Sequence, residues 1–338
     1  MRTILHVGTH KTGTTTIQQF AARRARELRD IGLWYPGFDL IGLKRHPAHH
    51  DFSHAVAGTL SSLSFEQAGE FVQAIAREAG DASHVLISAE PIYRHLIPEK
   101  PKGSAEYWAA REAYIARLAE VTAPLEPEIL IVLRRQDDFS RSLYQENVKA
   151  KHMKQDFRHF LKTRLPFFQY LEQINLFKKY FKIVDIAIFE DLAKDGELIR
   201  DFFHHIGIDI GKIDKIAEFN ESLPIELVEF KRQLNMTGLS KRELAAIARV
   251  LLDIGQHIDE FPRRPDLDWI PASEMAAFMN RFAAANAQIF SMMKSPPGRD
   301  TLFPAGRIRS EVFEALSPDR FKAINALVLR HLLTDSAA

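Results

Sequence analysis

The chain of 338 residues contains no cysteine. This absence excludes a disulfide framework, a thiolate nucleophile, a cysteine-ligated zinc site and an iron–sulfur cluster. It also fits a reducing compartment, because disulfides are rare in the proteins that stay there. Any chemistry that the protein performs must therefore come from other side chains.

An excess of charge of one sign is lacking as well, since 45 Lys and Arg residues stand against 44 Asp and Glu residues. Domains that bind nucleic acids are usually distinctly basic, so we expect no nucleic-acid partner. Long hydrophobic runs are also missing, because none reaches the roughly 18 residues of a membrane span. The first apolar run, residues 3–7, is shorter than the core of a secretory signal peptide. These absences together predict a cytoplasmic protein.

Short, unbroken apolar runs alternate with helical patterns in the first two thirds of the chain. The runs that predict strands occupy residues 3–7, 31–35, 85–88, 129–133 and 183–189. Unbroken apolar strands that alternate with helices are typical of parallel strands buried on both faces. We therefore expect an α/β fold in which helices flank both sides of an open parallel sheet.

The pattern changes near residue 220, beyond which it predicts helices and loops only. Residues 38–62 are predicted to be irregular, and residues 14–30 to form one helix. Neither an internal repeat nor a low-complexity linker divides the chain. We therefore expect a single domain over residues 1–338, with an α/β core at 1–235 and a helical C-terminal extension at 236–338.

The loop between the first predicted strand and the first predicted helix combines two glycines, a lysine and four threonines, as GTHKTGTTT over residues 8–16. Open α/β proteins bind phosphate at this place, because the first N–H groups of a helix lack internal partners and carry positive potential. An alternative is a threonine-rich helix cap without a ligand, although a cap needs only one hydroxyl. The candidate ligands are Lys11, Thr12, Gly13, Thr14, Thr15 and Thr16.

The spacing of this loop departs from the common nucleotide-binding motifs. Gly8 and Gly13 have the spacing of a Walker A loop, but that motif places its lysine directly after the second glycine. Here Thr14 follows Gly13, and Lys11 lies two residues before it. The sequence therefore predicts a P-loop-like anion site that differs from the loop of ordinary ATPases and kinases.

The segment HKTGTTT at residues 10–16 resembles the 5′-phosphosulfate loop of sulfotransferases that use 3′-phosphoadenosine 5′-phosphosulfate. The cytosolic form of that loop reads PKSGTTW, and many bacterial members read HKTGTT. Lys11 to Thr15 match position by position, whereas His10 and Thr16 depart from the cytosolic form. The resemblance is therefore to a bacterial, carbohydrate-type branch of the family.

The resemblance also implies an arginine after a later strand and a serine eight residues on, both on the 3′-phosphate of the co-substrate. Counting eight residues from Arg134 reaches Ser142, whereas counting from Arg135 reaches Leu143. The spacing therefore selects Arg134 and Ser142, and a guanidinium suits a phosphate because it can bind bidentately. Alternatively, solvated arginines merely end the strand. The late Arg-Lys-Gly loop of the family has no clear copy, and residues 294–299 are its nearest substitute.

Sulfuryl transfer to a hydroxyl calls for a general base near the loop. Glu90 lies two residues after the predicted strand 85–88. The resemblance implies a His or a Glu at this position. We expect Glu90 to act as the base and Lys11 to stabilise the leaving phosphate, with no metal required. Alternatives for Glu90 are a solvated carboxylate ahead of a proline, or replacement as base by a histidine. The competing histidines could also contact substrate, hold a metal or serve the structure: His46, His49, His50 and His54.

The acceptor is suggested only by residues 149–182, which hold nine Lys or Arg, two Asp or Glu and eight aromatic residues. A basic, aromatic stretch suits an anionic glycan or the surface of a membrane, although core aromatics on amphipathic helices would give the same pattern. We expect a sulfotransferase whose acceptor is a carbohydrate or glycolipid. The alternatives are a P-loop-type nucleotide kinase with an altered loop and a non-catalytic nucleotide-binding protein.

Overall fold

The structure is a computed structural model, and it describes residues 1–9, 11–100, 104–211, 222–257, 261 and 264–335. The chain divides into two compact units, neither of which is continuous in sequence. The first unit comprises residues 1–135, 165–218 and 282–304, and the second comprises residues 136–164, 219–281 and 305–338. The expectation of one domain with a boundary at residue 235 stays a prediction.

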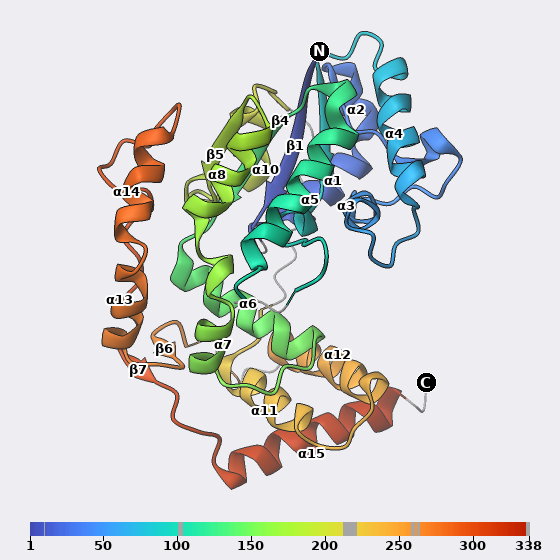
Figure 1. Ribbon diagram of the computed structural model, residues 1–338. Coiled ribbons are helices and arrows are strands. Elements are labelled where there is room, and N and C mark those ends of the chain that lie inside the picture. The colour runs from blue at the N-terminus through green and yellow to red at the C-terminus, as the bar shows by residue number, and fades with distance from the viewer. Residues whose placement is uncertain (10, 101–103, 212–221, 258–260, 262–263, 336–338) are drawn as a thin grey trace. The chain divides into compact units, whose positions relative to one another are not determined.

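The first unit is built on a five-stranded sheet in the order β2-β3-β1-β4-β5, with every pair of strands parallel (Figure 1). Its strands are β1 (Arg2–Gly8), β2 (Leu33–Trp34), β3 (His84–Ser88), β4 (Glu128–Leu133) and β5 (Val184–Ile188). Each lies where an apolar run predicts it. The predicted fold class, an open parallel sheet flanked by helices, is thus confirmed.

Helices cover both faces of this sheet. On one face Ile4 and Leu86 share a buried core with Ile17, Phe20 and Phe202. These last residues belong to α1 (Thr14–Arg23) and α10 (Leu198–His205), and α2 (Ala25–Asp30) joins the same core. On the other face lie α3 (His50–Ala57), α4 (Phe65–Glu78), α5 (Tyr107–Thr122) and α8 (Tyr170–Tyr180), which contact one another.

Two local predictions in this unit are wrong. Residues 14–30 form two helices, because the chain leaves helical geometry at Arg24, whose φ is −107°. Residues 38–62 contain α3, whose Phe52, Ala55 and Val56 are buried at helical spacing. The remaining elements of the unit are η1 (Phe38–Ile41), η2 (Glu90–Tyr93), η3 (Ala123–Leu125), η4 (Leu165–Phe167), α9 (Phe189–Leu192) and α14 (Ala283–Met292).

The second unit is mainly helical. Its helices are α6 (Gln136–Ala150), α7 (Phe157–Thr163), α11 (Ile225–Asn235), α12 (Lys241–His257), α13 (Ala272–Asn280) and α15 (Pro318–Asp335). A parallel pair of two-residue strands, β6 (Leu267–Asp268) and β7 (Glu311–Val312), corrects the prediction that only helices and loops follow residue 220. Strands this short contain no apolar run from which they could be recognised.

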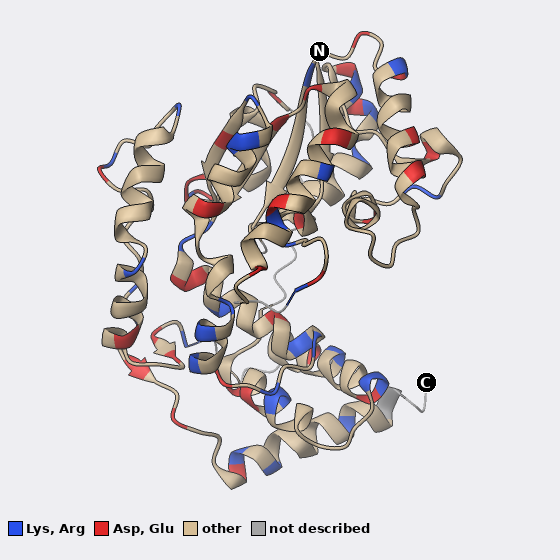
Figure 2. Ribbon diagram, in the orientation of Figure 1, with Lys and Arg blue, Asp and Glu red and all other residues tan. Residues whose placement is uncertain are grey.

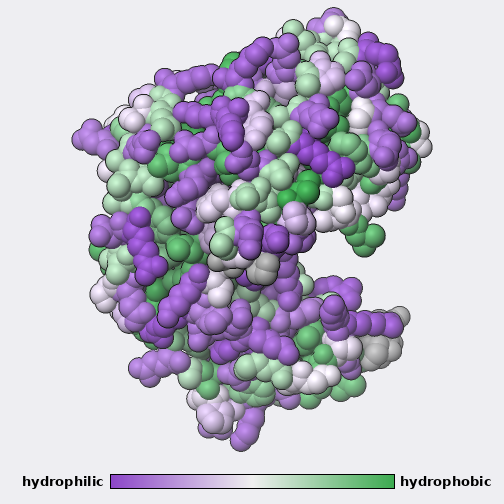
Figure 3. Space-filling model, in the orientation of Figure 1, coloured by the Kyte–Doolittle hydropathy of each residue, from purple (hydrophilic) through white to green (hydrophobic). Residues whose placement is uncertain are grey.

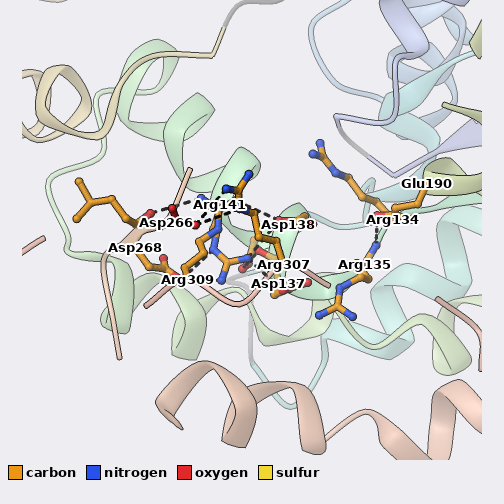
Figure 4. Close-up of polar contacts among 12 residues, drawn as sticks. Arg134, Arg135, Asp137, Asp138, Arg141, Glu190, Asp266, Asp268, Arg307 and Arg309 are labelled. Carbon is orange, nitrogen blue, oxygen red and sulfur yellow. Dashed lines mark hydrogen bonds and ion pairs between the residues drawn. The ribbon is translucent and has the colours of Figure 1, made fainter. Parts of the chain in front are cut away.

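A buried network of ion pairs connects β6 to α6 within the second unit (Figure 4). Arg141 Nη2 lies 2.6 Å from Asp268 Oδ2, and Arg141 Nη1 lies 3.1 Å from Asp137 Oδ2. Asp138 binds both Arg141 and Arg309, at 3.2 and 3.3 Å. Buried charges are tolerated when opposite charges and hydrogen bonds surround them, as they do here.

Charged residues of both signs are interspersed over the helices of each unit (Figure 2). On the face drawn in Figure 3, hydrophobic residues are scattered among hydrophilic ones. None of the described helices combines the length and the apolar character that crossing a bilayer requires.

Candidate functional site

The predicted loop, the predicted base and the predicted arginine follow three neighbouring strands. β1 lies between β3 and β4, with His6 in register with Ser88 and Gly8 in register with Val132. Continuing this register places Glu90 and Arg134, both just past strand ends, at the same carboxyl edge as the loop that starts at Gly8. Ligands of open α/β sheets bind at this edge.

The loop after β1 is held in shape by its own threonines. The amide and the hydroxyl of Thr9 both donate to the carbonyl oxygen of Val132, at 3.1 Å each. The Thr12 hydroxyl donates to the carbonyl oxygen of Thr9 at 2.7 Å. Lys11 adopts a φ of 69°, which is uncommon for a residue with a side chain. His10 lies outside the described residues.

Gly13 is required where the loop enters α1. Its φ is 68°, and a Cβ added there would lie only 2.2 Å from Leu198 Cδ2. No side chain caps α1, and its first turn contains no acidic residue. The helix therefore begins at a glycine and not at a threonine that caps it, and the binding of an anion at its first N–H groups stays a prediction.

The four predicted threonine ligands differ in exposure. Thr12, Thr14 and Thr16 are buried, whereas Thr15 is exposed. The hydroxyl oxygens of Thr12 and Thr14 lie 3.2 Å apart. A Cβ added at Gly8 would lie 2.5 Å from the Thr14 oxygen, so the absence of a side chain there lets the two hydroxyls come together.

Arg134 is held against this loop. Its Nη1 donates to the carbonyl oxygen of Lys11 at 2.7 Å, and its guanidinium carbon lies 5.0 Å from the centre of the Phe189 ring. The hydroxyl of Tyr170 donates to the Arg134 carbonyl oxygen at 2.7 Å. The structure thus brings the predicted arginine and the predicted lysine loop together.

The neighbouring Arg135 has other partners (Figure 4). Its amide donates to Glu190 Oε1 at 2.8 Å, and its Nη1 donates to the carbonyl oxygen of Pro304 at 3.1 Å. The two arginines thus have different partners, and the choice of Arg134 for the 3′-phosphate stays a prediction. Ser142 is half-buried on α6 in the second unit, whereas Arg134 belongs to the first. The pairing of the two residues on one phosphate stays a prediction.

Glu90 is half-buried and begins η2, with Pro91 as the next residue. The amide of Ala89 donates to the carbonyl oxygen of His6 at 3.1 Å, which ties the start of this segment to β1. Glu90 is therefore positioned by the sheet itself, at the end of the strand next to the loop. Its role as base stays a prediction.

A polar chain beneath the loop was missed by sequence reasoning. His6 Nδ1 lies 2.9 Å from the hydroxyl oxygen of Ser88, to which Gln18 Nε2 donates at 3.1 Å. His6 is fully buried, and burial lowers its pKa to about 3, so its ring is neutral. A polar residue in an otherwise apolar strand was the available signal.

The histidine cluster divides into different environments. His49 is 1% exposed, lies 2.8 Å from the Pro36 carbonyl oxygen through Nε2 and accepts from the Ser88 amide through Nδ1 at 3.1 Å. These bonds give His49 a structural role. His46 is exposed, whereas His50 and His54 lie on α3. Across the described residues, no group of three or more His, Asp or Glu could hold a metal ion.

Arg299, in the nearest substitute for the late phosphate loop, has partners within the first unit. It binds Asp191 bidentately, at 2.6 and 2.9 Å, and also donates to the carbonyl oxygens of Thr301 and Leu302. The role of residues 294–299 as a phosphate loop stays a prediction, and it would require Arg299 to exchange some of these bonds for a phosphate.

The basic, aromatic stretch 149–182 is divided between the two units at residue 164. Within each unit its cations meet carboxylates, as with Arg158 and Glu274 or Lys182 and Glu126, both at 2.8 Å. Seven of its eight aromatic side chains are buried: Phe157, Phe160, Phe167, Phe168, Tyr170, Phe177 and Phe181. A membrane-surface contact through this stretch stays a prediction, and its aromatic part has only Tyr180 outside the core.

No protein-family model matches the sequence, and no curated protein matches it. Among solved structures, the chain is similar to the crystal structure of a sulfotransferase from Alicyclobacillus acidocaldarius, with 14% sequence identity and a TM-score of 0.39. The similarity covers 65% of this chain and 87% of that one. The likeness concerns the fold, and it assigns no activity to the chain.

Proposed function

We propose that the protein is a sulfotransferase. It would transfer the sulfuryl group of 3′-phosphoadenosine 5′-phosphosulfate to a hydroxyl of a carbohydrate or glycolipid acceptor, in the cytoplasm. The observation that carries the proposal is the loop of residues 8–16. It joins a motif of the family to an uncapped helix start and to the arginine selected by spacing.

The loop suits the donor because it gathers groups that hold anions. The uncapped start of α1 offers backbone N–H donors, Lys11 adds a full charge, and the buried hydroxyls of Thr12 and Thr14 lie beside them. In the transfer, the bond from sulfur to the 5′-phosphate oxygen breaks and a bond from sulfur to the acceptor oxygen forms. The acceptor proton passes to Glu90, and Lys11 stabilises the charge that develops on the leaving phosphate.

Thermal stability in the presence of nucleotides tests this proposal against the two alternatives. We expect adenosine 3′,5′-bisphosphate to raise the Tm without magnesium, since the loop supplies the positive charge. If only ATP together with magnesium raises the Tm, the result would instead support a kinase and overturn the proposal. Stabilisation by the bisphosphate without turnover of the donor in a broad acceptor screen would support a non-catalytic binding protein.

Replacing Arg134 with alanine is expected to lower the affinity for adenosine 3′,5′-bisphosphate by roughly 10–100-fold, which is the effect of losing one charged hydrogen bond. The affinity for adenosine 5′-phosphate should fall less, because this nucleotide has no 3′-phosphate for the guanidinium to bind. Isothermal titration of both nucleotides gives the comparison. The Arg135→Ala variant removes the same charge one residue on and serves as the control. Equal losses for the two nucleotides would show that Arg134 does not read the 3′-phosphate.

Replacing Lys11 with methionine is expected to lower kcat roughly 10²–10³-fold, as the loss of a group that stabilises developing charge does. Arg134 holds Lys11 through its carbonyl oxygen, so that bond survives the substitution. The release of adenosine 3′,5′-bisphosphate from the donor measures turnover. Lys11→Arg keeps the charge and should retain more activity, and an undiminished kcat in Lys11→Met would remove the lysine from the mechanism.

A further inference from the structure

Three basic side chains on α3 and directly after η2 take no part in the proposed nucleotide site. Arg94 follows η2, four residues after Glu90, while His50 and His54 lie one turn apart on α3. α3 and η2 contact each other within the first unit. The three side chains therefore come from elements on the β3 side of β1, where Glu90 also lies, whereas Arg134 follows β4 on the other side.

Arg94 is a half-buried cation, and no described carboxylate forms an ion pair with it. Burial lowers its pKa, yet an arginine stays charged at every physiological pH. In the part of the chain that the structure describes, no residue forms a hydrogen bond or ion pair with its side chain. Glu99, whose charge acts on Arg94, is itself exposed. The Arg94 guanidinium therefore favours the binding of an anion, which would accept its hydrogen bonds and balance its charge.

The two histidines add neutral donors next to this charge. His50 Nε2 is buried without a hydrogen-bond partner, and burial with the nearby His54 and Arg94 lowers the pKa of His50 to about 4. Burial and Arg94 lower the pKa of His54 as well. His54 lies edge-on against His95, with ring centres 4.8 Å apart, and its Nδ1 lies 3.3 Å from the hydroxyl oxygen of Thr59. Asp51, the acidic residue between them on α3, accepts a hydrogen bond from Ser62.

We propose that Arg94, His50 and His54 form a subsite for an oxyanionic group on the acceptor, a carboxylate or a sulfate ester carried by a sugar. This inference rests on the proposed function, because it takes the ligand to be the molecule that Glu90 deprotonates. A guanidinium and imidazole N–H groups bind such oxygens through charge-assisted hydrogen bonds. A neutral sugar would bind poorly, because it would bury the cation and leave its donors unpaired.

The test is direct binding of three probes to the full chain: methyl glucuronide, methyl glucoside 6-sulfate and uncharged methyl glucoside. We expect one or both charged probes to bind roughly tenfold or more tightly than the glucoside. Arg94→Gln should abolish that difference, whereas Arg94→Lys should retain part of it. Preference for only one charged probe would identify the oxyanion as carboxylate or as sulfate ester.

The matched control is Arg117→Gln. Arg117 is another arginine of the first unit, and its guanidinium carbon lies 3.8 Å from the centre of the Phe65 ring. This variant should keep the preference for charged probes. His50→Phe keeps the ring volume but loses Nε2, so it should reduce the preference several-fold and provides a second readout if Arg94→Gln does not fold. Equal binding of all three probes to the unaltered chain would overturn the subsite, as would an unchanged preference in Arg94→Gln.

Failure of the subsite and failure of the proposed function are distinguished on the same preparation. Titration with adenosine 3′,5′-bisphosphate should give the same affinity in the unaltered chain and in Arg94→Gln. A chain that binds this nucleotide but shows no preference among the probes would keep the sulfotransferase proposal and lose the subsite. A chain that prefers the charged probes but binds no bisphosphate would keep the anion site and lose its assignment to a sulfate acceptor.

Discussion

Replacing Glu90 with glutamine is expected to lower kcat by roughly 10²–10⁴-fold, the contribution of a positioned general base. The affinity for adenosine 3′,5′-bisphosphate should stay unchanged, because Glu90 lies at the end of β3 and the nucleotide loop follows β1. The amide of glutamine has nearly the same size as the carboxylate, so η2 should keep its place. Acceptor-dependent release of the bisphosphate measures kcat, and titration measures affinity.

Glu70→Gln is the matched control for this prediction. Glu70 is an exposed carboxylate on α4, and its substitution should leave kcat unchanged. If both variants keep full turnover, Glu90 is not the base, and His50 or His54 becomes the next candidate. A Glu90→Gln variant that loses nucleotide affinity together with turnover would instead show that Glu90 supports the loop.

Lowering the pH from 7 to 5 is expected to reduce the free energy of unfolding by about 6 kcal/mol, through the buried His6 and His49 and the half-buried His50, which each contribute about 2 kcal/mol. Burial lowers the pKa of His6 to about 3 and those of His49 and His50 to about 4. In the unfolded chain each returns to about 6.5. The unfolded chain therefore binds more protons across this window, so stability is fully present above pH 6.5 and falls as the pH drops towards the folded values.

Urea unfolding at pH 7 and pH 5 measures this difference. His49→Gln removes one of the three titrating groups, so it should reduce the pH dependence by about a third, whatever its own effect on stability at pH 7. His46→Gln changes an exposed histidine and should leave the pH dependence as it was. Equal free energies of unfolding at the two pH values would contradict the neutral, buried state of these rings.

The sheet of the first unit could be predicted because each of its strands coincides with a continuous apolar run in the sequence. β4 is the clearest case, since Ile129 to Leu133 are all buried. Weaker features escaped prediction for physical reasons. α3 is short and lies in a histidine-rich segment, so the spacing of Phe52, Ala55 and Val56 was not recognised. The interruption at Arg24 was not predicted, because neither a glycine nor a proline marks it in residues 14–30.

The candidate site was predicted to the extent that it is local in sequence. The loop motif and the count from Arg134 to Ser142 require only neighbouring residues. The bond from Arg134 to the Lys11 carbonyl joins residues far apart in sequence, and the pairing of Arg299 with Asp191 does the same. Such partners are decided by the fold. That no described residue forms a hydrogen bond or ion pair with the Arg94 side chain was equally invisible, since a sequence shows a charge but not what surrounds it.

The chain passes between the two units five times, at the boundaries of residues 135/136, 164/165, 218/219, 281/282 and 304/305. One consequence concerns truncation. A gene fragment ending at residue 235 would discard residues 282–304 of the first unit, among them Arg299, which holds Asp191 just after β5. The C-terminal segment that looks dispensable therefore supplies part of the first unit, and deleting it would remove residues of both units.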